Sequence, residues 1–218
     1  MRLFGSWRRR LAALGLAVAG AAAGVVAAAP AQAQTGCSDV HVVFARGSTE
    51  LPGLGIVGTP FVNSLKSKLP GKSVSVYAVN YAADILQTSA GPGATDMTRN
   101  VRSVAQRCPN TKFVLGGYSQ GASVTDISIG IRTFLGVGET IPTELAPRIA
   151  AIAVFGNPLR LFGQDIPKAS QLYGSKAIDI CAPGDPVCAG GINFMAHLMY
   201  PLDGSTTRAA EFAASKLR

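Results

Sequence analysis

The chain has 218 residues and a formal net charge of +8, with 20 Lys and Arg residues against 12 Asp and Glu residues. The basic residues form no clustered stripe, which argues against a nucleic-acid-binding protein, and no nucleic-acid partner is expected. A weak association with an anionic membrane or cell-envelope surface is the most that this charge supports.

Residues 1–33 have the pattern of a secretory signal peptide. Arg2 and the run from Arg8 to Arg10 form a basic n-region, residues 11–29 are free of charge, and Ala31-Gln32-Ala33 is a small-x-small cleavage pattern. The uncharged run is long enough to span a bilayer, so a retained membrane anchor is the alternative. Its low content of Leu, Ile and Phe favours the signal peptide. We therefore expect a secreted protein, extracellular or associated with the cell envelope, whose mature chain begins near Gln34.

Removal of 33 residues from the chain of 218 leaves 185 and lowers the net charge from +8 to +4, because the segment contains four arginines and no acid. This length is sufficient for one domain with a substantial core. No linker rich in Ser, Gly or Pro and no internal repeat divides it. The sequence predicts a single domain over residues 34–218, which we expect to be a monomer.

Strands and helices alternate along this domain. Apolar segments predict strands over residues 39–45, 73–79, 112–116, 149–155 and 177–181. One helix is expected to begin with Thr59 as its cap and Pro60 in the first helical position, and a second to carry Met97 through Cys108. A third follows residue 119 and runs to about residue 135, and a last helix is capped by Ser205. This alternation predicts a three-layer α/β/α sandwich with a central parallel sheet.

The segment Gly117-Tyr118-Ser119-Gln120-Gly121 lies between a predicted strand and a predicted helix, which is the context of a nucleophile elbow. The two glycines permit a sharp turn where a Cβ atom would collide with neighbouring chain. The N-terminus of the following helix favours developing negative charge. A chance Gly/Ser turn is the alternative in a chain with 25 glycines. The flanking elements favour Ser119 as a nucleophile.

A serine nucleophile needs a base, and the chain offers two histidines. His41 lies inside the first predicted strand, where packing is its ordinary role. His197 follows the last predicted strand, and only His197 satisfies the order Ser, acid, His that α/β-hydrolases use. A satisfied surface or core histidine is the alternative for His197, but the scarcity of histidine favours its role as the base.

The orienting acid is expected between Ser119 and His197. The candidates are Asp126, Glu139, Glu144, Asp165, Asp179 and Asp185. Asp126 lies too far along the helix after the elbow, and Asp179, in the middle of a strand, is the second choice. Asp185 is the first choice, because it lies in a turn just after the carboxyl end of a strand, where catalytic groups of α/β sheets gather. An ordinary aspartate in a Gly/Pro turn is the alternative.

The oxyanion of an acyl-transfer reaction needs hydrogen-bond donors, and two are expected. The backbone N–H of Gln120, directly after the nucleophile, is the first. The second is Ser48, in the loop Arg46-Gly47-Ser48-Thr49-Glu50, which offers both an N–H and a hydroxyl. Such a turn is unremarkable by itself, so the sequence only suggests this role for Ser48.

The four cysteines of an exported chain predict disulfides, and three pairings are open to them. A local bridge between Cys181 and Cys188 is natural, and Cys37 would then pair with Cys108. A zinc site is the competing reading, but the chain has no C-x-x-C pair and only two histidines. We therefore expect no metal.

Four motifs together resemble the cutinase family, and in particular the cutinase-like esterases secreted by mycobacteria and related actinobacteria. They are the Ser48 loop, the elbow, the segment from Cys181 to Cys188, and His197-Leu198-Met199-Tyr200. The resemblance covers the chain from about Cys37 to the last helix. It implies an α/β-hydrolase fold with five parallel strands in a flavodoxin-like order and an active site without a large lid.

The resemblance also implies roles for individual residues. Ser119, Asp185 and His197 would form the catalytic triad, and Ser48 and Gln120 the oxyanion hole. The implied disulfides are Cys37–Cys108 and Cys181–Cys188.

The implied activity is hydrolysis of carboxylic esters with short- to medium-chain acyl groups, lipids among them, through an acyl-enzyme and without a cofactor. An envelope lipid acyltransferase or a phospholipase with the same triad is the alternative, and the intact triad argues against a non-catalytic secreted binding protein. Residues 80–96 and 190–195 differ from fungal members. We expect them to form the walls that receive an acyl chain, with ordinary packing as the alternative.

Overall fold

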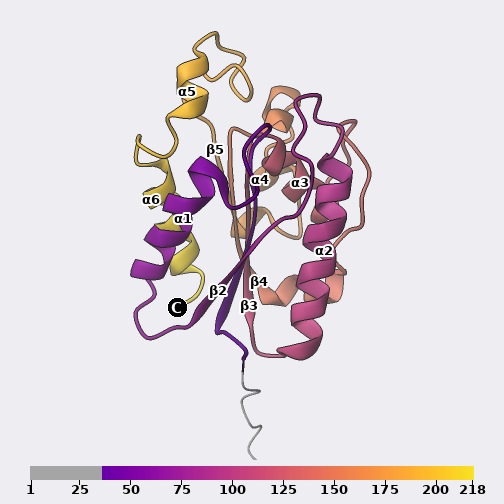
Figure 1. Cartoon of the computed structure of the whole chain (residues 1–218), viewed down its shortest axis with the longest axis vertical. Coiled ribbons are helices and arrows are strands. Elements are labelled where there is room, and N and C mark those ends of the chain that lie inside the picture. Colours follow the sequence, from indigo (N-terminus) through magenta and orange to yellow (C-terminus); the bar gives the residue numbers. More distant parts are fainter. Residues whose placement is uncertain (1–35) are drawn as a thin grey trace, which may run out of the picture. The chain divides into compact units, whose positions relative to one another are not determined.

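The computed structural model describes residues 36–218, so the predicted signal peptide lies outside the described residues. Its centre is a five-stranded parallel sheet in the order β2-β1-β3-β4-β5 (Figure 1), the flavodoxin-like order that the resemblance implied. The strands are β1 (Val40–Ala45), β2 (Val74–Ala78), β3 (Lys112–Tyr118), β4 (Ile149–Phe155) and β5 (Ala177–Ile180). Each lies within two residues of its predicted bounds, because uninterrupted apolar runs mark buried parallel strands clearly.

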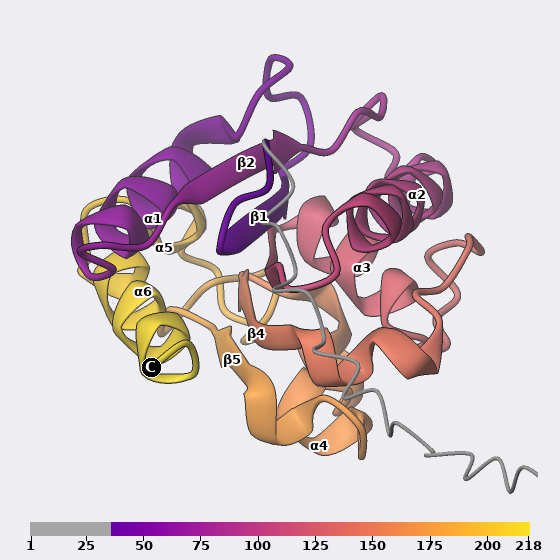
Figure 2. The same cartoon turned by 90° about the horizontal axis from the view of Figure 1, so that it is seen from below.

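Helices cover both faces of the sheet (Figure 2). Helices α1 (Gly55–Ser67) and α6 (Ser205–Ser215) pack against each other on one face, and α2 (Ala90–Arg107) and α3 (Gln120–Ser128) on the other. Two short helices, α4 (Ile166–Ala169) and α5 (Phe194–Leu198), lie in the connections before and after β5. The predicted three-layer sandwich is therefore confirmed for the described residues.

Neighbouring residues of one strand supply two separate cores. In β1, Val43 and Ala45 pack with the layer of α2 and α3, whereas Val42 and Phe44 pack with the layer of α1 and α6. Alternate side chains of a strand point to opposite faces, and here both faces are covered by helices. The strand is therefore held in place by helices packed on both faces of the sheet.

Helix α1 begins at Gly55, so the predicted start with Thr59 as cap and Pro60 at the first helical position is wrong. Both residues lie inside the helix. The Glu50 carboxylate accepts the N–H of Ile56 at 2.7 Å and satisfies one of the free donors of the first turn. A cap that comes from outside the helix leaves no local pattern in the sequence.

Helix α3 ends at Ser128, and its predicted extension to about Leu135 is wrong. Gly130 has φ +86°, and its N–H reaches the Ile127 carbonyl at 3.0 Å. The N–H of Ile131 then returns to the Asp126 carbonyl at 2.9 Å. A left-handed glycine with backward hydrogen bonds is a common helix ending.

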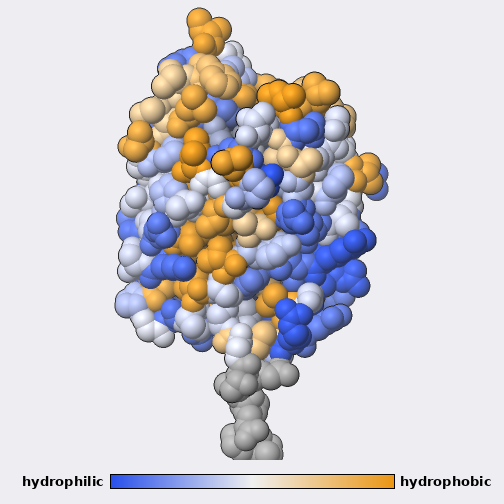
Figure 3. Space-filling model, viewed as in Figure 1, coloured by the Kyte–Doolittle hydropathy of each residue, from blue (hydrophilic) through white to orange (hydrophobic). Residues whose placement is uncertain are grey.

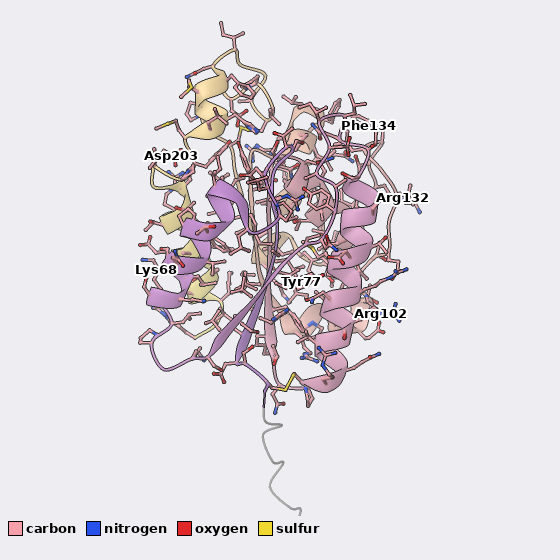
Figure 4. The ribbon with its side chains drawn as sticks, in the orientation of Figure 1. Lys68, Tyr77, Arg102, Arg132, Phe134 and Asp203 are labelled. Atoms are coloured by element: carbon pink, nitrogen blue, oxygen red, sulfur yellow. A yellow bond between two sulfur atoms is a disulfide. The ribbon has the colours of Figure 1, made fainter. Side chains whose placement is uncertain are left out.

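The last helix, α6, starts at Ser205, but this residue is not its cap as predicted. Gly204 precedes the helix, and the Asp203 carboxylate accepts the N–H of Ser205 at 2.8 Å. Lys68, labelled in Figure 4, lies just after α1 and pairs with Glu211 of α6 at 3.0 Å across the surface. Among residues 36–218, no helix combines the length and apolar character needed to cross a membrane.

Two disulfides connect the four cysteines as the resemblance implied. Cys37–Cys108 joins the segment before β1 to the end of α2, and it is the sulfur–sulfur bond below the sheet in Figure 4. Cys181–Cys188 closes a short loop directly after β5. The second bridge therefore lies at the carboxyl edge of the sheet, where the candidate site is found.

Candidate active site

Ser119 occupies a sharp turn between the end of β3 and the start of α3. Its backbone has φ 54° and ψ −118°, a conformation that costs free energy in any residue with a side chain and is typical of a nucleophile elbow. A Cβ atom at Gly117 would collide with the Gly121 carbonyl, and one at Gly121 with the Ala45 carbonyl. The two glycines of the motif are therefore required by the close approach of the backbone.

The structure brings Ser119, His197 and Asp185 together at the carboxyl edge of the sheet. Nε2 of His197 lies 3.0 Å from the Ser119 hydroxyl oxygen, and Nδ1 lies 2.8 Å from Oδ2 of Asp185. A carboxylate only accepts hydrogen bonds, so Nδ1 carries a proton and Nε2 accepts the serine hydroxyl proton. Ser119 is 8% exposed, His197 4% and Asp185 0%. This geometry allows His197 to remove the proton of a serine nucleophile.

Asp185 is held by three donors in the loop closed by the Cys181–Cys188 disulfide. Besides His197, the Tyr200 hydroxyl donates to Oδ2 at 2.6 Å and the Val187 N–H donates to Oδ1 at 2.7 Å. Burial acts to raise the pKa of Asp185, but these hydrogen bonds outweigh burial and hold its pKa below the ordinary value. The buried carboxylate therefore stays ionised at neutral pH, as the partner of an imidazolium must.

His197 lies on α5 and is fixed from two sides. The hydroxyl of Tyr118, the residue before the nucleophile, donates to the His197 carbonyl at 2.7 Å, and the two rings are 5.0 Å apart between centroids. Behind the imidazole, Gly156 has φ 58°, and a Cβ atom there would lie 2.7 Å from Cε1 of His197. The ring therefore has little freedom to leave its position.

The loop that carries Ser48 is anchored around a buried guanidinium. Arg46 donates to the carbonyls of Glu50 at 2.7 Å and Tyr81 at 2.8 Å, and the Thr49 N–H donates to the Ala83 carbonyl at 2.7 Å. Ser48 faces the start of α3, where its hydroxyl oxygen lies 3.3 Å from the side-chain Oε1 of Gln120. The two residues that sequence reasoning assigned to the oxyanion hole are therefore neighbours.

A cleft of about 380 Å³ opens at Ser119 and His197. Its apolar walls are Ile56, Ile85, Val187, Phe194 and Leu198, and its polar side is formed by Ser48, Thr49, Glu50 and Gln87. Residues 80–96 contribute Ile85 and Gln87 to it, and residues 190–195 contribute Phe194.

The other candidates lie elsewhere. Asp179 accepts hydrogen bonds from the Asn157 side chain at 2.9 Å and the Ile166 N–H at 3.1 Å, and His41 is bound to Ser75 and Asn100. Asp126 is buried in α3. Within the described residues, the atoms of Cys181, Cys188 and Asp185 come close enough to suggest a metal site. Both sulfurs are bonded to each other and the carboxylate is bound to His197, so this cluster does not fit a cation.

Sequence reasoning missed three residues that hold the site: Tyr118, Gly156 and Tyr200. Tyr200 carried a usable signal, since it follows His197 by three residues within one of the motifs. Tyr118 is in the elbow motif itself, but its bond to a carbonyl 79 residues away has no local signature. The same is true of Gly156, whose role depends on a ring packed against it.

The chain is similar to known ester hydrolases in sequence and in structure. The cutinase family model matches residues 36–217. A cutinase of Kineococcus radiotolerans is 55% identical over 184 residues, which cover 84% of this chain and 63% of that protein. Carboxylesterase Culp1 of Mycobacterium tuberculosis is 46% identical, covering 83% of this chain and 82% of that protein. Phospholipase Culp4 of the same organism is 42% identical, covering 98% and 96%.

Among solved structures, a Trichoderma reesei cutinase in complex with a phosphonate inhibitor superposes with a TM-score of 0.67 at 30% identity. The superposition covers 84% of this chain and 78% of that one. Together with the family match over nearly all described residues, this likeness shows that the chain belongs to the cutinase family of carboxylic ester hydrolases.

Proposed function

We propose that Ser119, His197 and Asp185 are the catalytic triad of this serine esterase. The observation that carries the proposal is the unbroken hydrogen-bonded path from the Ser119 hydroxyl through both ring nitrogens of His197 to Asp185, with spans of 3.0 and 2.8 Å. A nucleophile within reach of a base, with the base held by a third group, is the general arrangement of covalent acyl transfer.

The reaction would run in two halves. His197 takes the Ser119 proton at Nε2 as the hydroxyl oxygen attacks the ester carbonyl, and Asp185 stabilises the imidazolium. The oxyanion receives hydrogen bonds from Gln120 and Ser48. His197 then gives its proton to the leaving alcohol, which leaves an acyl group on Ser119. Water, deprotonated by His197, releases the acid and restores the enzyme.

The cleft supports an apolar acyl group of short to medium length as the substrate class. Its volume of about 380 Å³ and its five apolar wall residues suit such a chain better than a polar one. Large apolar side chains are exposed on the segments that line the cleft or within two residues of a lining residue: Leu51 at 85%, Ile85 at 72%, Leu86 at 80%, Ile192 at 100% and Phe194 at 59%. Figure 3 shows hydrophobic surface at the end of the molecule that carries α5. These side chains support lipid esters, and contact with a membrane or cell-envelope surface, as part of the proposal.

A series of p-nitrophenyl esters of increasing chain length, with a phospholipid and a triglyceride, tests this function. Ser119→Ala is expected to lower kcat by roughly 10⁶, as loss of a triad nucleophile does elsewhere. Labelling by a fluorophosphonate probe should disappear with it. Residual turnover within tenfold of the parent, or labelling that survives the substitution, would contradict the assignment of Ser119.

A phospholipase or an envelope acyltransferase is the second candidate, and the phospholipase is favoured by the name of one relative that matches almost the whole chain. Both activities would use the same acyl-enzyme, so the triad does not separate them. Adding alcohol acceptors and measuring transfer against hydrolysis does, and release of fatty acid from phospholipid vesicles identifies the phospholipase. A non-catalytic binding protein would show no probe labelling at all.

We also propose that the protein is secreted and monomeric. The pattern of residues 1–33 and the two disulfides support export, because disulfides persist in oxidising compartments. Amino-terminal sequencing of protein from culture supernatant should begin near Gln34. Sedimentation of that protein gives its oligomeric state, and a dimer would contradict the monomer.

A further inference from the structure

The side chain of Gln120 makes contacts that its backbone role does not require. It is 0% exposed, and its carboxamide lies between two serine hydroxyls. Oε1 is 3.3 Å from the hydroxyl oxygen of Ser48, and Nε2 is 3.4 Å from that of Ser89, the residue before α2. A buried carboxamide spanning two elements is a candidate to position one of them.

The far end of this chain of contacts is itself held in place. The Asp84 N–H donates to the Ser89 hydroxyl oxygen at 3.3 Å, and the Ser89 N–H donates to Oδ2 of Asp84 at 2.8 Å. The Asp84 carboxylate also accepts the Thr88 N–H at 3.1 Å. Ser89 is therefore part of a closed turn, and its hydroxyl oxygen already accepts one hydrogen bond. The Ser89 side chain also contributes most to lowering the pKa of the Asp84 carboxyl, so its hydroxyl proton has two acceptors within reach, the Asp84 carboxylate and Gln120.

The direction of the hydrogen bonds decides what Ser48 can do. When Ser48 donates to Oε1 of Gln120, its single hydroxyl proton is occupied and cannot reach an oxyanion. Rotation of the carboxamide by a half-turn exchanges its oxygen and nitrogen at nearly the same positions. Ser89 then donates to the oxygen of Gln120, and the nitrogen of Gln120 donates to Ser48. The hydroxyl proton of Ser48 becomes free for the oxyanion.

We propose that Ser89 and the side chain of Gln120 are positioning residues for the oxyanion hole, acting through the hydroxyl of Ser48. With the carboxamide turned, the path runs from the Asp84 N–H through Ser89 and Gln120 to Ser48, and each group in it donates to the next. This inference rests on the proposed function, since it needs an oxyanion formed at Ser119. The developing negative charge favours the carboxamide orientation in which Ser48 donates.

The hydrogen-bonded path from Asp84 through Ser89 and Gln120 to Ser48, called the relay below, also connects the oxyanion hole to a wall of the cleft. Residues 84–89 contain Ile85 and Gln87, which line the cleft, as well as Ser89. Ala83, directly before this loop, also contacts the Ser48 loop, because its carbonyl accepts the Thr49 N–H at 2.7 Å. An acyl chain that contacts Ile85 therefore contacts the same loop that carries Ser89 and, through the relay, orients Ser48.

A double-mutant cycle between Ser89 and Ser48 tests the relay with soluble p-nitrophenyl butyrate as substrate. Ser48→Ala should lower kcat by about 10²–10³, the effect of losing one oxyanion donor. Ser89→Ala should lower kcat by about tenfold with KM unchanged, the effect of losing one hydrogen bond. In the Ser48→Ala background, Ser89→Ala should change kcat by less than about twofold, because its route of action is already gone.

Three further variants separate positioning from folding. Gln120→Met keeps the backbone N–H and the length of the side chain, and it should reproduce the kcat loss of Ser89→Ala. Ser89→Thr keeps the hydroxyl and should restore kcat. Ser123→Ala is the matched control, since Ser123 is another buried serine, in α3, that lies outside the relay. It should leave kcat unchanged.

Two results would overturn the relay. One is an equal kcat loss on Ser89→Ala with and without the Ser48 hydroxyl, which would place Ser89 in the fold alone. The other is full kcat in both Ser89→Ala and Gln120→Met at an unchanged unfolding temperature. If Ser89→Ala does not fold, the Gln120→Met and Ser48→Ala pair completes the same cycle. Ser119→Ala checks the proposed function separately, since activity in that variant contradicts the triad whatever the relay does.

Discussion

The two histidines of this domain lie in similar settings at opposite ends of the sheet. At the carboxyl edge, His197 lies between the Ser119 hydroxyl at 3.0 Å and the Asp185 carboxylate at 2.8 Å. Towards the other edge, His41 near the start of β1 lies between the Ser75 hydroxyl at 2.7 Å and the Asn100 side-chain oxygen at 2.9 Å. Both imidazoles are buried and both touch a serine.

The differences between them show what a catalytic triad needs beyond its residue types. Asn100 carries no charge, so it cannot stabilise an imidazolium as Asp185 can. Burial, opposed by the hydrogen bond to Asn100 and aided by the positive charge of Arg107, lowers the pKa of His41 below its ordinary value. Ser75 lies within regular strand rather than in a strained turn at a helix N-terminus. His41 is therefore a packing group, and only the His197 cluster is proposed to be catalytic.

Removing the negative charge beside His197 should have the largest effect on kcat, and adding one beside His41 should have almost none. Asp185→Asn should lower kcat by about 10⁴, because the imidazole loses both its correct tautomer and its counter-charge. Asn100→Asp should leave kcat within about twofold, since charge alone builds no elbow or oxyanion hole. Steady-state kinetics with p-nitrophenyl butyrate measures both. The comparison breaks if Asp185→Asn stays within tenfold of the parent while Asp179→Asn is inactive, which would make Asp179 the acid.

Removing the imidazole of His41 should act on stability rather than on turnover. His41→Ala removes the hydrogen bond to Asn100, leaves Ser75 with Ser38 as its side-chain partner, and opens a cavity, which together cost about 2–4 kcal/mol of unfolding free energy. Urea denaturation measures this loss, and kcat of the folded fraction should be unchanged. A tenfold fall in kcat with little loss of stability would mean that His41 takes part in the chemistry after all.

The pH dependence of stability should report His41 with a definite sign. Because its pKa is lowered in the folded state, the unfolded chain binds more protons, and stability falls as the pH drops through the ordinary value of about 6.5. His41→Gln removes this titration and should flatten the curve between pH 7 and pH 5, by at most about 1.4 kcal/mol per pH unit. Identical slopes in the parent and His41→Gln would show that His41 titrates normally in the fold.

Asp126 should give the smallest effect on stability, and its pH dependence should have the opposite sign to that of His41. Both of its carboxylate oxygens are buried in α3. Burial, together with the nearby charge of Asp179, raises its pKa well above the ordinary value and outweighs the opposing effect of the Asn157 side chain. Its contribution therefore weakens as the pH rises above about 3.8 towards the folded pKa. Asp126→Asn should stabilise the protein at pH 7 by about 1 kcal/mol. Calorimetry at pH 5 and pH 7 checks it, and a gain that does not grow with pH would contradict the raised pKa of Asp126.

The strands and the candidate triad could be predicted because their signals are local or depend on chain order. Uninterrupted apolar runs mark the strands, and the elbow motif with two histidines leaves His197 as the only base in the required order. The start of α1 could not be placed in this way, since the Glu50 carboxylate that accepts the Ile56 N–H lies six residues before it. Asp203 lies only two residues before Ser205, so the start of α6 carried a local signal that sequence reasoning did not use. The end of α3 was predictable from Gly130, a signal that sequence reasoning passed over.

Contacts between distant segments explain the rest of what sequence reasoning missed. The Tyr118 hydroxyl reaches the His197 carbonyl, and the Gln120 carboxamide reaches Ser89, only because the sheet brings their elements together. No spacing rule relates such pairs along the chain. Residue types in a motif therefore predict which groups react, while the groups that hold them in place come from the packed structure.

Gly156 sets a limit on how this enzyme can diversify. Because even one methyl group at this position would press on the ring of His197, every substitution there is expected to disturb this proposed catalytic base before it alters any wall of the cleft. Variation in substrate preference, whether by natural drift or in a laboratory library, must then enter through residues such as Ile85 and Phe194. Gly156 behind His197 is expected to stay unchanged while the residues that line the cleft vary.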